Sequence, residues 1–152
     1  MTTPLLKPSL YEAGGPGATG SASLKGGRCL ACGYVFFPLQ RYGCEQCGAH
    51  GDALAPATLA GTGTLLARAT VHMHARPERT APFVIGTVRL DDGPVVRTLL
   101  DASPTAPPSC GTRMRAMLVE VPGTEPAVLV RDLRFAAIDA GPAGASARGG
   151  LA

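Results

Sequence analysis

The sequence contains no tryptophan, only three tyrosines and four phenylalanines, and charged residues at just 16% of its 152 positions. So little charge is not typical of a coiled coil, and 45% hydrophobic residues are too many for a disordered protein. No run of about 18 apolar residues occurs, so we expect no transmembrane helix and no membrane partner. The composition indicates one compact unit or two very small ones.

A secretion signal is also missing from the printed N-terminus, because MTTPLLKPSLYEAGG lacks a basic start and a long apolar core. We therefore expect a cytoplasmic protein, in which cellular reductants keep thiols reduced. Under those conditions the five cysteines are expected to bind metal before they form disulfides.

Strong helical periodicity is absent throughout, and changes in composition divide the chain into four segments. We predict a leader or docking segment at residues 1–23, a cysteine-rich segment at 24–57, a β-rich segment at 58–140 and a flexible tail at 141–152. Within the leader, residues 8–12 are predicted to form one helical turn, because the glycines that follow prevent a longer helix.

The β-rich segment contains short apolar runs separated by Gly and Pro clusters, at residues 58–74, 83–90, 95–100, 113–121 and 127–138. Asp91-Asp92-Gly93 predicts a hairpin between the second and third runs, since glycine readily takes a positive φ. Gly61 and Gly63 are expected to let the first strand coil or bulge. Five strands in this order predict a mainly β fold with a five-stranded OB-fold barrel, and an SH3-like barrel is the structural alternative.

Four of the cysteines form two Cys-x-x-Cys pairs, Cys29 with Cys32 and Cys44 with Cys47, and eleven residues separate the pairs. This spacing is typical of a structural metal site with four thiolates, which leaves no open position for a reacting water. The glycine after each pair is expected to turn amide N–H groups toward the sulfurs and so offset their negative charge. We predict structural Zn²⁺, with iron in a rubredoxin-like site as the alternative.

The remaining polar residues form no recognisable catalytic motif, and we predict no catalytic residue. The sequence has no Gly-x-Ser-x-Gly elbow, no phosphate-binding glycine loop and no His-Glu-x-x-His. Cys110 is expected to be a small core residue, with a reactive thiol as the alternative. His72 and His74 share one face of a predicted strand and are expected to be solvated rather than metal-binding. His50 is expected in a loop or at a partner surface.

The charge of the chain argues against a nucleic-acid partner. The formal net charge is +3, and four zinc-bound thiolates would change it by −4 + 2 = −2, to about +1. Acidic and basic residues are interleaved, as in Arg131-Asp132, whereas nucleic-acid binding usually needs a basic stripe. The second and third β runs offer a single ring, Phe83, on which a base could stack.

An ordered set of motifs runs through most of the chain. The cysteine-rich segment contains Leu24-x-x-x-Arg28-Cys29-x-x-Cys32-Gly33, then Phe36-Phe37-Pro38, then Cys44-x-x-Cys47-Gly48. The β-rich segment contains Gly61-Thr62-Gly63-Thr64-Leu65, Pro82-Phe83-Val84-Ile85, Val88-x-Leu90-Asp91-Asp92-Gly93 and Cys110-Gly111-x-Arg113. In this combination the chain resembles the DUF35 family. It departs from the family pattern at Glu45, where a proline is frequent, and in its glycine-rich leader.

The resemblance implies an N-terminal rubredoxin-like zinc ribbon followed by an OB-fold, and a role in acyl-CoA metabolism. Members of the family are typically small partners of thiolase-like enzymes, and some are joined to MaoC-type hydratases. It therefore implies a hetero-oligomer in which a partner, such as a β-ketoacyl-CoA thiolase or a retro-aldolase of aromatic or steroid degradation, supplies the catalytic residues. This chain would support assembly and the access of the CoA thioester.

Residues that contact CoA are not assigned by this resemblance. Arg28, Arg41 and Tyr42 near the ribbon are candidates because CoA is a polyanion, although ordinary surface or packing roles are the simpler interpretation. The alternative functions are a free acyl-CoA-binding protein, a partner of a MaoC-type hydratase and a nucleic-acid-binding OB-fold protein.

Overall fold

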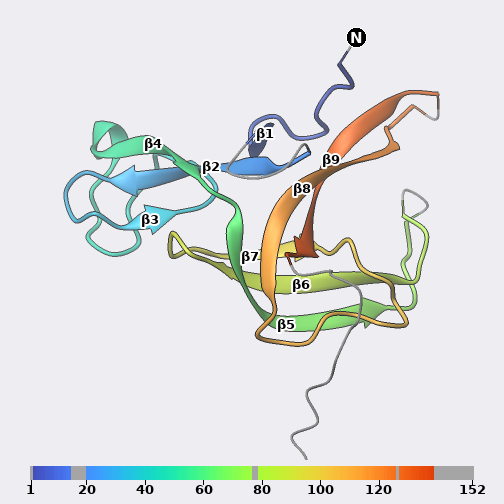
Figure 1. Cartoon of the computed structure of the whole chain (residues 1–152). Coiled ribbons are helices and arrows are strands. Elements are labelled where there is room, and N and C mark those ends of the chain that lie inside the picture. Colours follow the sequence, from blue (N-terminus) through green and yellow to red (C-terminus); the bar gives the residue numbers. More distant parts are fainter. Residues whose placement is uncertain (1, 15–19, 77–78, 126, 139–152) are drawn as a thin grey trace, which may run out of the picture.

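The computed structural model describes residues 2–14, 20–76, 79–125 and 127–138 (Figure 1). Within these ranges the chain forms nine β-strands and one short 3-10 turn, η1 (Gly51–Ala53), and no α-helix. The prediction of a mainly β fold is therefore confirmed. No helix in this part of the chain is long and apolar enough to cross a membrane. The predicted tail at residues 141–152 lies outside the described residues.

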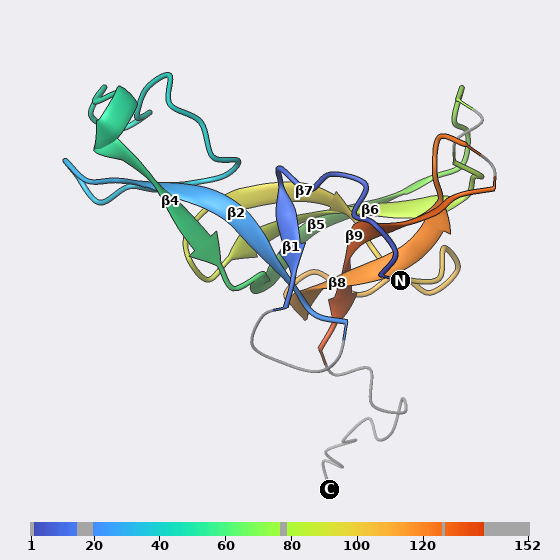
Figure 2. The same cartoon turned by 90° about the horizontal axis from the view of Figure 1, so that it is seen from above.

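A four-stranded antiparallel sheet is built around β2 (Ala22–Cys29). β1 (Tyr11–Ala13) and β3 (Val35–Phe36) pair with one edge of β2, and β4 (Leu54–Leu59) pairs with the other. Figure 2 shows β2 and β4 running outward from the rest of the molecule to the loops that carry the cysteines. Two strands therefore hold the cysteine-bearing loops away from the second sheet.

The leader does not form the helical turn predicted for residues 8–12. Residues 8–10 make a turn, in which the Leu10 N–H donates to the Lys7 carbonyl at 3.0 Å, and β1 begins at the next residue. Tyr11 pairs with Leu24 and is 1% exposed. Burial of this large ring and pairing with β2 thus decide the local conformation.

The second sheet has five strands in the order β7-β6-β5-β8-β9, and all neighbours are antiparallel. Its strands are β5 (Thr62–Val71), β6 (Phe83–Leu90), β7 (Val95–Leu99), β8 (Arg113–Pro122) and β9 (Leu129–Ala137). The two edges meet through a parallel bridge between Leu100 and Phe135, beside which the Asp101 N–H donates to the Phe135 carbonyl at 2.8 Å. The curled sheet fits the predicted OB-fold.

The first β run, predicted as one strand at 58–74, is divided between the two sheets. Its first two residues end β4, and the chain then changes sheets before β5 begins. The change occurs at Gly61, whose φ of 71° is accessible to glycine without strain. A Cβ at this position would also lie 2.7 Å from the Ala116 Cβ, so glycine is needed for close packing on β8.

The two sheets share one apolar core. Tyr11, Leu24 and Leu59 from the first sheet pack in the same buried cluster as Leu65 and Phe135 from the barrel. A second cluster beneath the cysteine loops is much smaller and contains Cys29, Phe36, Cys44 and Leu54. So small a core gives little stability, and segments of this kind usually need a metal or disulfides.

Candidate metal centre

Two loops of the first sheet bring the four predicted ligands together. Cys29 ends β2 and Cys32 lies in the turn that leads to β3, while Cys44 and Cys47 lie in the loop between β3 and η1. All four sulfurs lie within 4.8 Å of one another. The Sγ atoms of Cys29 and Cys47 are 3.6 Å apart, as are those of Cys32 and Cys44. Four cysteines in this arrangement can hold a metal ion.

The backbone repeats the same turn around each cysteine pair. In each turn the N–H of the glycine after the pair donates to the carbonyl of the first cysteine, at 2.7 Å for Gly33 and 2.9 Å for Gly48. The first cysteine's own N–H donates to the carbonyl five residues further on, at 2.8 Å and 2.7 Å respectively. The φ angles of Gly33 and Gly48, 81° and 79°, lie in the left-handed region that favours glycine. This is the turn that the two Cys-x-x-Cys-Gly motifs predict.

The geometry of the cluster fits a tetrahedral thiolate site. Zinc–sulfur bonds of about 2.3 Å in a tetrahedron place neighbouring sulfurs about 3.8 Å apart, close to the observed 3.6 Å. Four sulfur donors favour zinc or iron over magnesium or calcium, which prefer oxygen ligands. With one metal bound to all four thiolates no coordination position remains open, so the site can stabilise the loops but cannot activate water.

Backbone amides and burial act in opposite directions on the pKa values of the Cys44 and Cys32 thiols. Burial raises the pKa of Cys44, but hydrogen bonds from the amides of Cys47 and Gln46 outweigh it and lower this pKa to about 7. The Tyr34 amide favours the Cys32 thiolate, yet burial and the three nearby sulfurs raise the pKa of Cys32 to about 12. Without a cation, the cluster therefore resists full ionisation, and a divalent metal would supply the missing positive charge.

The structure does not bring the other candidate residues into a site. Within the described residues, the four-cysteine cluster is the only group of three or more His, Cys, Asp or Glu side chains close enough to share a metal. His50 is exposed at the start of η1, and His72 is exposed just after β5. His74 bonds through Nδ1 to the Arg76 carbonyl at 3.0 Å and packs edge-on against the Phe83 ring.

Cys110 is exposed, so its prediction as a core residue is wrong. The residue lies in the turn before β8, where the Thr112 N–H donates to the Ser109 carbonyl at 3.2 Å. Gly111, with a φ of 91°, donates its N–H to the Leu65 carbonyl and so fixes the turn on β5. The backbone of this turn is anchored while the Cys110 side chain faces solvent.

The candidate CoA contacts beside the ribbon are surface residues. Arg28 and Arg41 are exposed, and the nearest carboxylate to Arg41 is Asp52 at 3.9 Å. Tyr42 is 95% exposed, and Leu30, which lies between Cys29 and Cys32, is 68% exposed. These side chains are available to a partner or ligand, and an ordinary surface role fits them equally.

No sequence pattern predicted a buried polar group that joins the leader to the barrel. The Tyr11 hydroxyl donates to the Asp132 carboxylate at 2.9 Å, and Arg134 donates to the other carboxylate oxygen at 2.5 Å. Asp132 is 7% exposed. Although burial raises the pKa of Asp132, Arg134 and Tyr11 lower it overall. Burial and the bond to Asp132 raise the pKa of Tyr11 to about 12.

The backbone of the leader also follows β9. Leu5 forms a parallel bridge with Arg131, the Leu6 N–H donates to the Arg131 carbonyl at 2.9 Å, and the Arg131 N–H donates to the Pro4 carbonyl at 2.8 Å. Because Tyr11 and Asp132 are 121 positions apart, no local pattern could have predicted this contact.

Two comparisons with known proteins agree with this architecture. Residues 57–119 match the family described as "ChsH2, C-terminal OB-fold domain". Among solved structures, a chain of "Ltp2-ChsH2(DUF35) aldolase" is similar, with a TM-score of 0.56 and 25% sequence identity. The similarity covers 73% of this chain and 83% of that chain.

Proposed function

Because this chain belongs to the DUF35 family, we propose that it is a zinc-binding accessory subunit of a thiolase-type acyl-CoA enzyme and is not itself the catalyst. The similarity to a chain of an aldolase structure carries this proposal. At 73% of the chain, the similar region is longer than the barrel segment alone, so the likeness extends beyond the OB-fold. A shared OB-fold by itself would say little about function.

The same similarity makes an aldolase the first partner to test. The similar chain is part of an aldolase structure, and we propose that the partner of this chain catalyses aldol cleavage or the related thiolase reaction on a CoA thioester. In this assembly the partner chain carries the catalytic residues. This division of labour is consistent with the cysteine cluster, since a metal held by four thiolates has no position left for substrate.

We propose that the tip of the first sheet is the part that docks on the partner. Tyr42 and Leu30 are large, exposed and carried by loops that the metal would hold rigid. Aromatic and arginine side chains are enriched among the residues that contribute most of the binding energy at protein interfaces. Arg28 directly precedes Cys29, and Arg41 directly precedes Tyr42. Docking here would place these arginines near a CoA thioester held between the chains.

The zinc in this proposal is structural, with Cys29, Cys32, Cys44 and Cys47 as its ligands. In the same proposal the zinc ribbon is residues 24–57, the OB-fold domain is 58–140, and residues 1–23 are a leader that would dock in addition to the tip of the first sheet. A cytoplasmic location is part of the proposal, because reduced thiols are needed to bind the metal.

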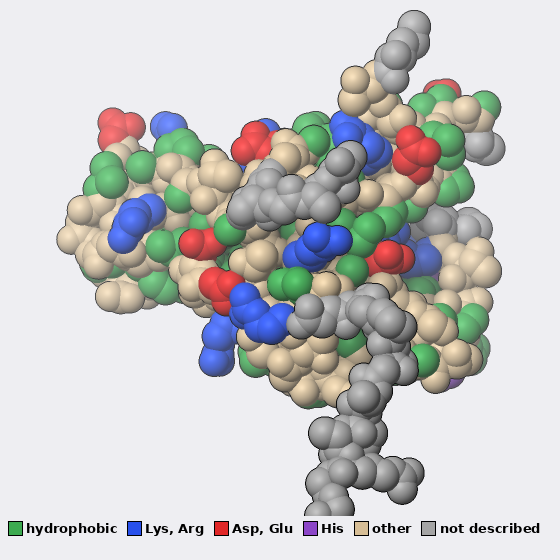
Figure 3. All heavy atoms as spheres, in the orientation of Figure 1, with side chains coloured by type: hydrophobic (Ala, Val, Ile, Leu, Met, Phe, Trp, Pro, Cys, Tyr) green, Lys and Arg blue, Asp and Glu red, His purple; other side chains and the backbone are tan. Residues whose placement is uncertain are grey.

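The charged surface supports a protein partner over a nucleic acid. On the face drawn in Figure 3, Lys and Arg side chains lie interspersed with Asp and Glu and do not form one basic stripe. On β6 and β7 the described side chains include one aromatic ring, Phe83. A single-strand-binding OB surface usually combines a basic groove with several stacking rings.

The proposal is tested by affinity capture of the tagged chain from its native cell extract, followed by mass spectrometry. We expect a thiolase-like enzyme in near-stoichiometric amount. A variant with Tyr42→Ala and Leu30→Ser should capture less of it and fold normally, as judged by metal content and circular dichroism. Recovery of a MaoC-type hydratase instead would change the partner class, and recovery of the chain alone with measurable CoA affinity would favour the free-binding alternative.

A further inference from the structure

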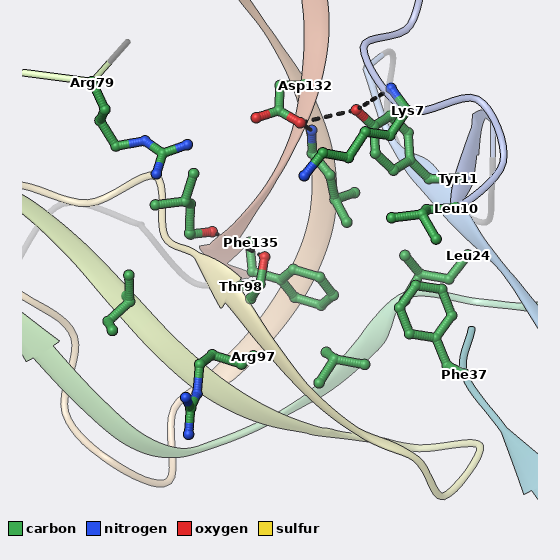
Figure 4. Close-up of a pocket in the computed structure, with 14 residues that line it drawn as sticks. Lys7, Leu10, Tyr11, Leu24, Phe37, Arg79, Arg97, Thr98, Asp132 and Phe135 are labelled. Atoms are coloured by element: carbon green, nitrogen blue, oxygen red, sulfur yellow. Dashed lines mark hydrogen bonds between the residues drawn. The ribbon is translucent and has the colours of Figure 1, made fainter. Parts of the chain in front are cut away.

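A pocket of about 300 Å³ lies where the leader, the first sheet and the barrel meet (Figure 4). Leu10 from the leader, Leu24 from β2 and Phe135 from β9 contribute to its apolar wall. Figure 4 shows the Tyr11 and Phe37 rings on one side of this pocket and Arg79 and Arg97 on the other. The pocket shares no residue with the metal cluster, although Phe37 lies between the two cysteine pairs in the sequence.

Three cationic side chains line the same pocket: Lys7 from the leader, Arg79 from the segment before β6, and Arg97 from β7. Within the described residues none of the three is paired with a carboxylate. Arg79 instead lies over the Phe83 ring, with its guanidinium carbon 5.1 Å from the ring centre. Among the described residues, three cationic side chains therefore lie around the pocket with no carboxylate paired to them.

Of the described residues that line the pocket, one is a carboxylate, and it is already engaged. Asp132 accepts hydrogen bonds from the Tyr11 hydroxyl, from Arg134 and from the Leu133 N–H. Its charge is balanced by Arg134, which is 14% exposed and is not a lining residue. Asp132 thus holds the leader in place, and no described carboxylate competes with an outside anion for Lys7, Arg79 or Arg97.

We propose that this pocket binds a small amphipathic carboxylate, with its apolar part against Leu10, Phe37 and Leu133, which line the pocket and are partly exposed, and its carboxylate at the cationic side chains. Ligand pockets of this kind are mostly apolar, with a few polar groups that fix the ligand's orientation, and about 300 Å³ is at the small end of their range. Arginine suits a carboxylate because its guanidinium can donate two parallel hydrogen bonds. The proposal does not depend on an enzyme partner.

The test is a titration of the full-length, ¹⁵N-labelled chain with octanoate, followed by amide chemical shifts. We expect saturable shifts that cluster around Arg79, Arg97 and Leu133, and much weaker binding of the neutral analogue octanol. Arg97→Gln should weaken octanoate binding about three- to tenfold, because a charge-assisted contact is lost. Arg89→Gln is the matched control, since Arg89 is an exposed arginine on the adjacent strand and does not line the pocket.

Three outcomes would overturn the proposal: no saturable shift at millimolar octanoate, equal binding of octanol, or equal weakening by Arg97→Gln and Arg89→Gln. Unchanged amide positions away from the pocket in both variants would show that they fold. Capture of an enzyme partner is measured separately, so failure of this inference leaves the proposed accessory role untouched, and the reverse also holds.

Discussion

At the scale of single residues, the four cysteines differ from Cys110 in what surrounds them. Each of the four has three other sulfurs within 4.8 Å, whereas Cys110 is an exposed thiol outside the cluster. A structural zinc site derives its affinity from the complete ligand set, so removing one thiolate should release the metal and loosen the loops that it holds.

Cys47→Ser is therefore expected to reduce bound zinc from about one ion per chain to nearly none, and to lower the midpoint of thermal unfolding. Elemental analysis of the purified protein measures the metal and distinguishes zinc from iron. Cys110→Ser is the control and should keep the full metal content. Equal zinc in the Cys47→Ser and wild-type proteins would contradict the assignment of these ligands.

Tyr11 is the residue whose ionisation should report the contact between the leader and the barrel. Its pKa is raised from 10.0 to about 12 by burial and by the bond to Asp132, so the folded state favours the neutral phenol. The stability that this contributes is present below pH 10 and is lost as the pH rises through about 12.

Tyr11→Phe should lower the free energy of unfolding by about 1 kcal/mol at neutral pH, because the buried hydrogen bond to Asp132 is lost together with the weaker one from the Lys7 N–H. Chemical denaturation at several pH values should show this difference shrinking above pH 10, as the wild type loses the contribution of Tyr11. Tyr42→Phe removes a hydroxyl that is fully in solvent and should leave stability unchanged at neutral pH. A Tyr11→Phe effect that stays constant to pH 12 would contradict the role of the phenol.

At the scale of elements, β5 shows how glycine permits the barrel to close. The sequence predicts that Gly61 and Gly63 let this strand bend, and a register shift does occur, between Leu65 and Ala67. The role of Gly63 itself is different: it pairs with both Leu90 on β6 and Met114 on β8. A Cβ on Gly63 would lie 2.2 Å from the Arg89 carbonyl oxygen, so the close approach of β6 excludes any side chain.

Gly63→Ala is expected to destabilise the protein by about 1–3 kcal/mol, since the backbone of β5 or β6 must move to admit the methyl group. Gly43→Ala is the matched control, because a Cβ there meets nothing within 4 Å and its backbone suits any residue. Denaturant midpoints of the two variants give the comparison. Equal stability of both would show that the barrel adapts at this position.

Local patterns in the sequence predicted the elements better than the contacts between them. The cysteine spacing and the Asp91-Asp92-Gly93 hairpin are encoded within a few residues, and Gly93 does turn with a φ of 118°. The change of sheet at Gly61 was not predicted, because an apolar run continues across it. Cys110 was misassigned since burial depends on the turn that carries it, and the Tyr11–Asp132 contact depends on the whole fold.

At the scale of the whole molecule, the shared core makes the two sheets one structural unit. Residues of β1, β2 and β4 pack in the same buried cluster as residues of the barrel, while the cysteine loops lie beyond it with a small cluster of their own. The molecule therefore has a well-packed body and a projecting tip, whose small core would be stabilised by a metal at the four cysteines. Such a tip suits a subunit that contacts another protein.

The central claim is that a partner enzyme carries the chemistry and needs this chain. The most direct test is to purify the thiolase-like enzyme captured with it and to measure aldol cleavage or thiolysis of its acyl-CoA substrate with and without added chain. We predict that the enzyme alone is inactive or unstable, that this chain alone is inactive, and that a stoichiometric mixture restores turnover. A stable, fully active enzyme in the absence of this chain would contradict the account.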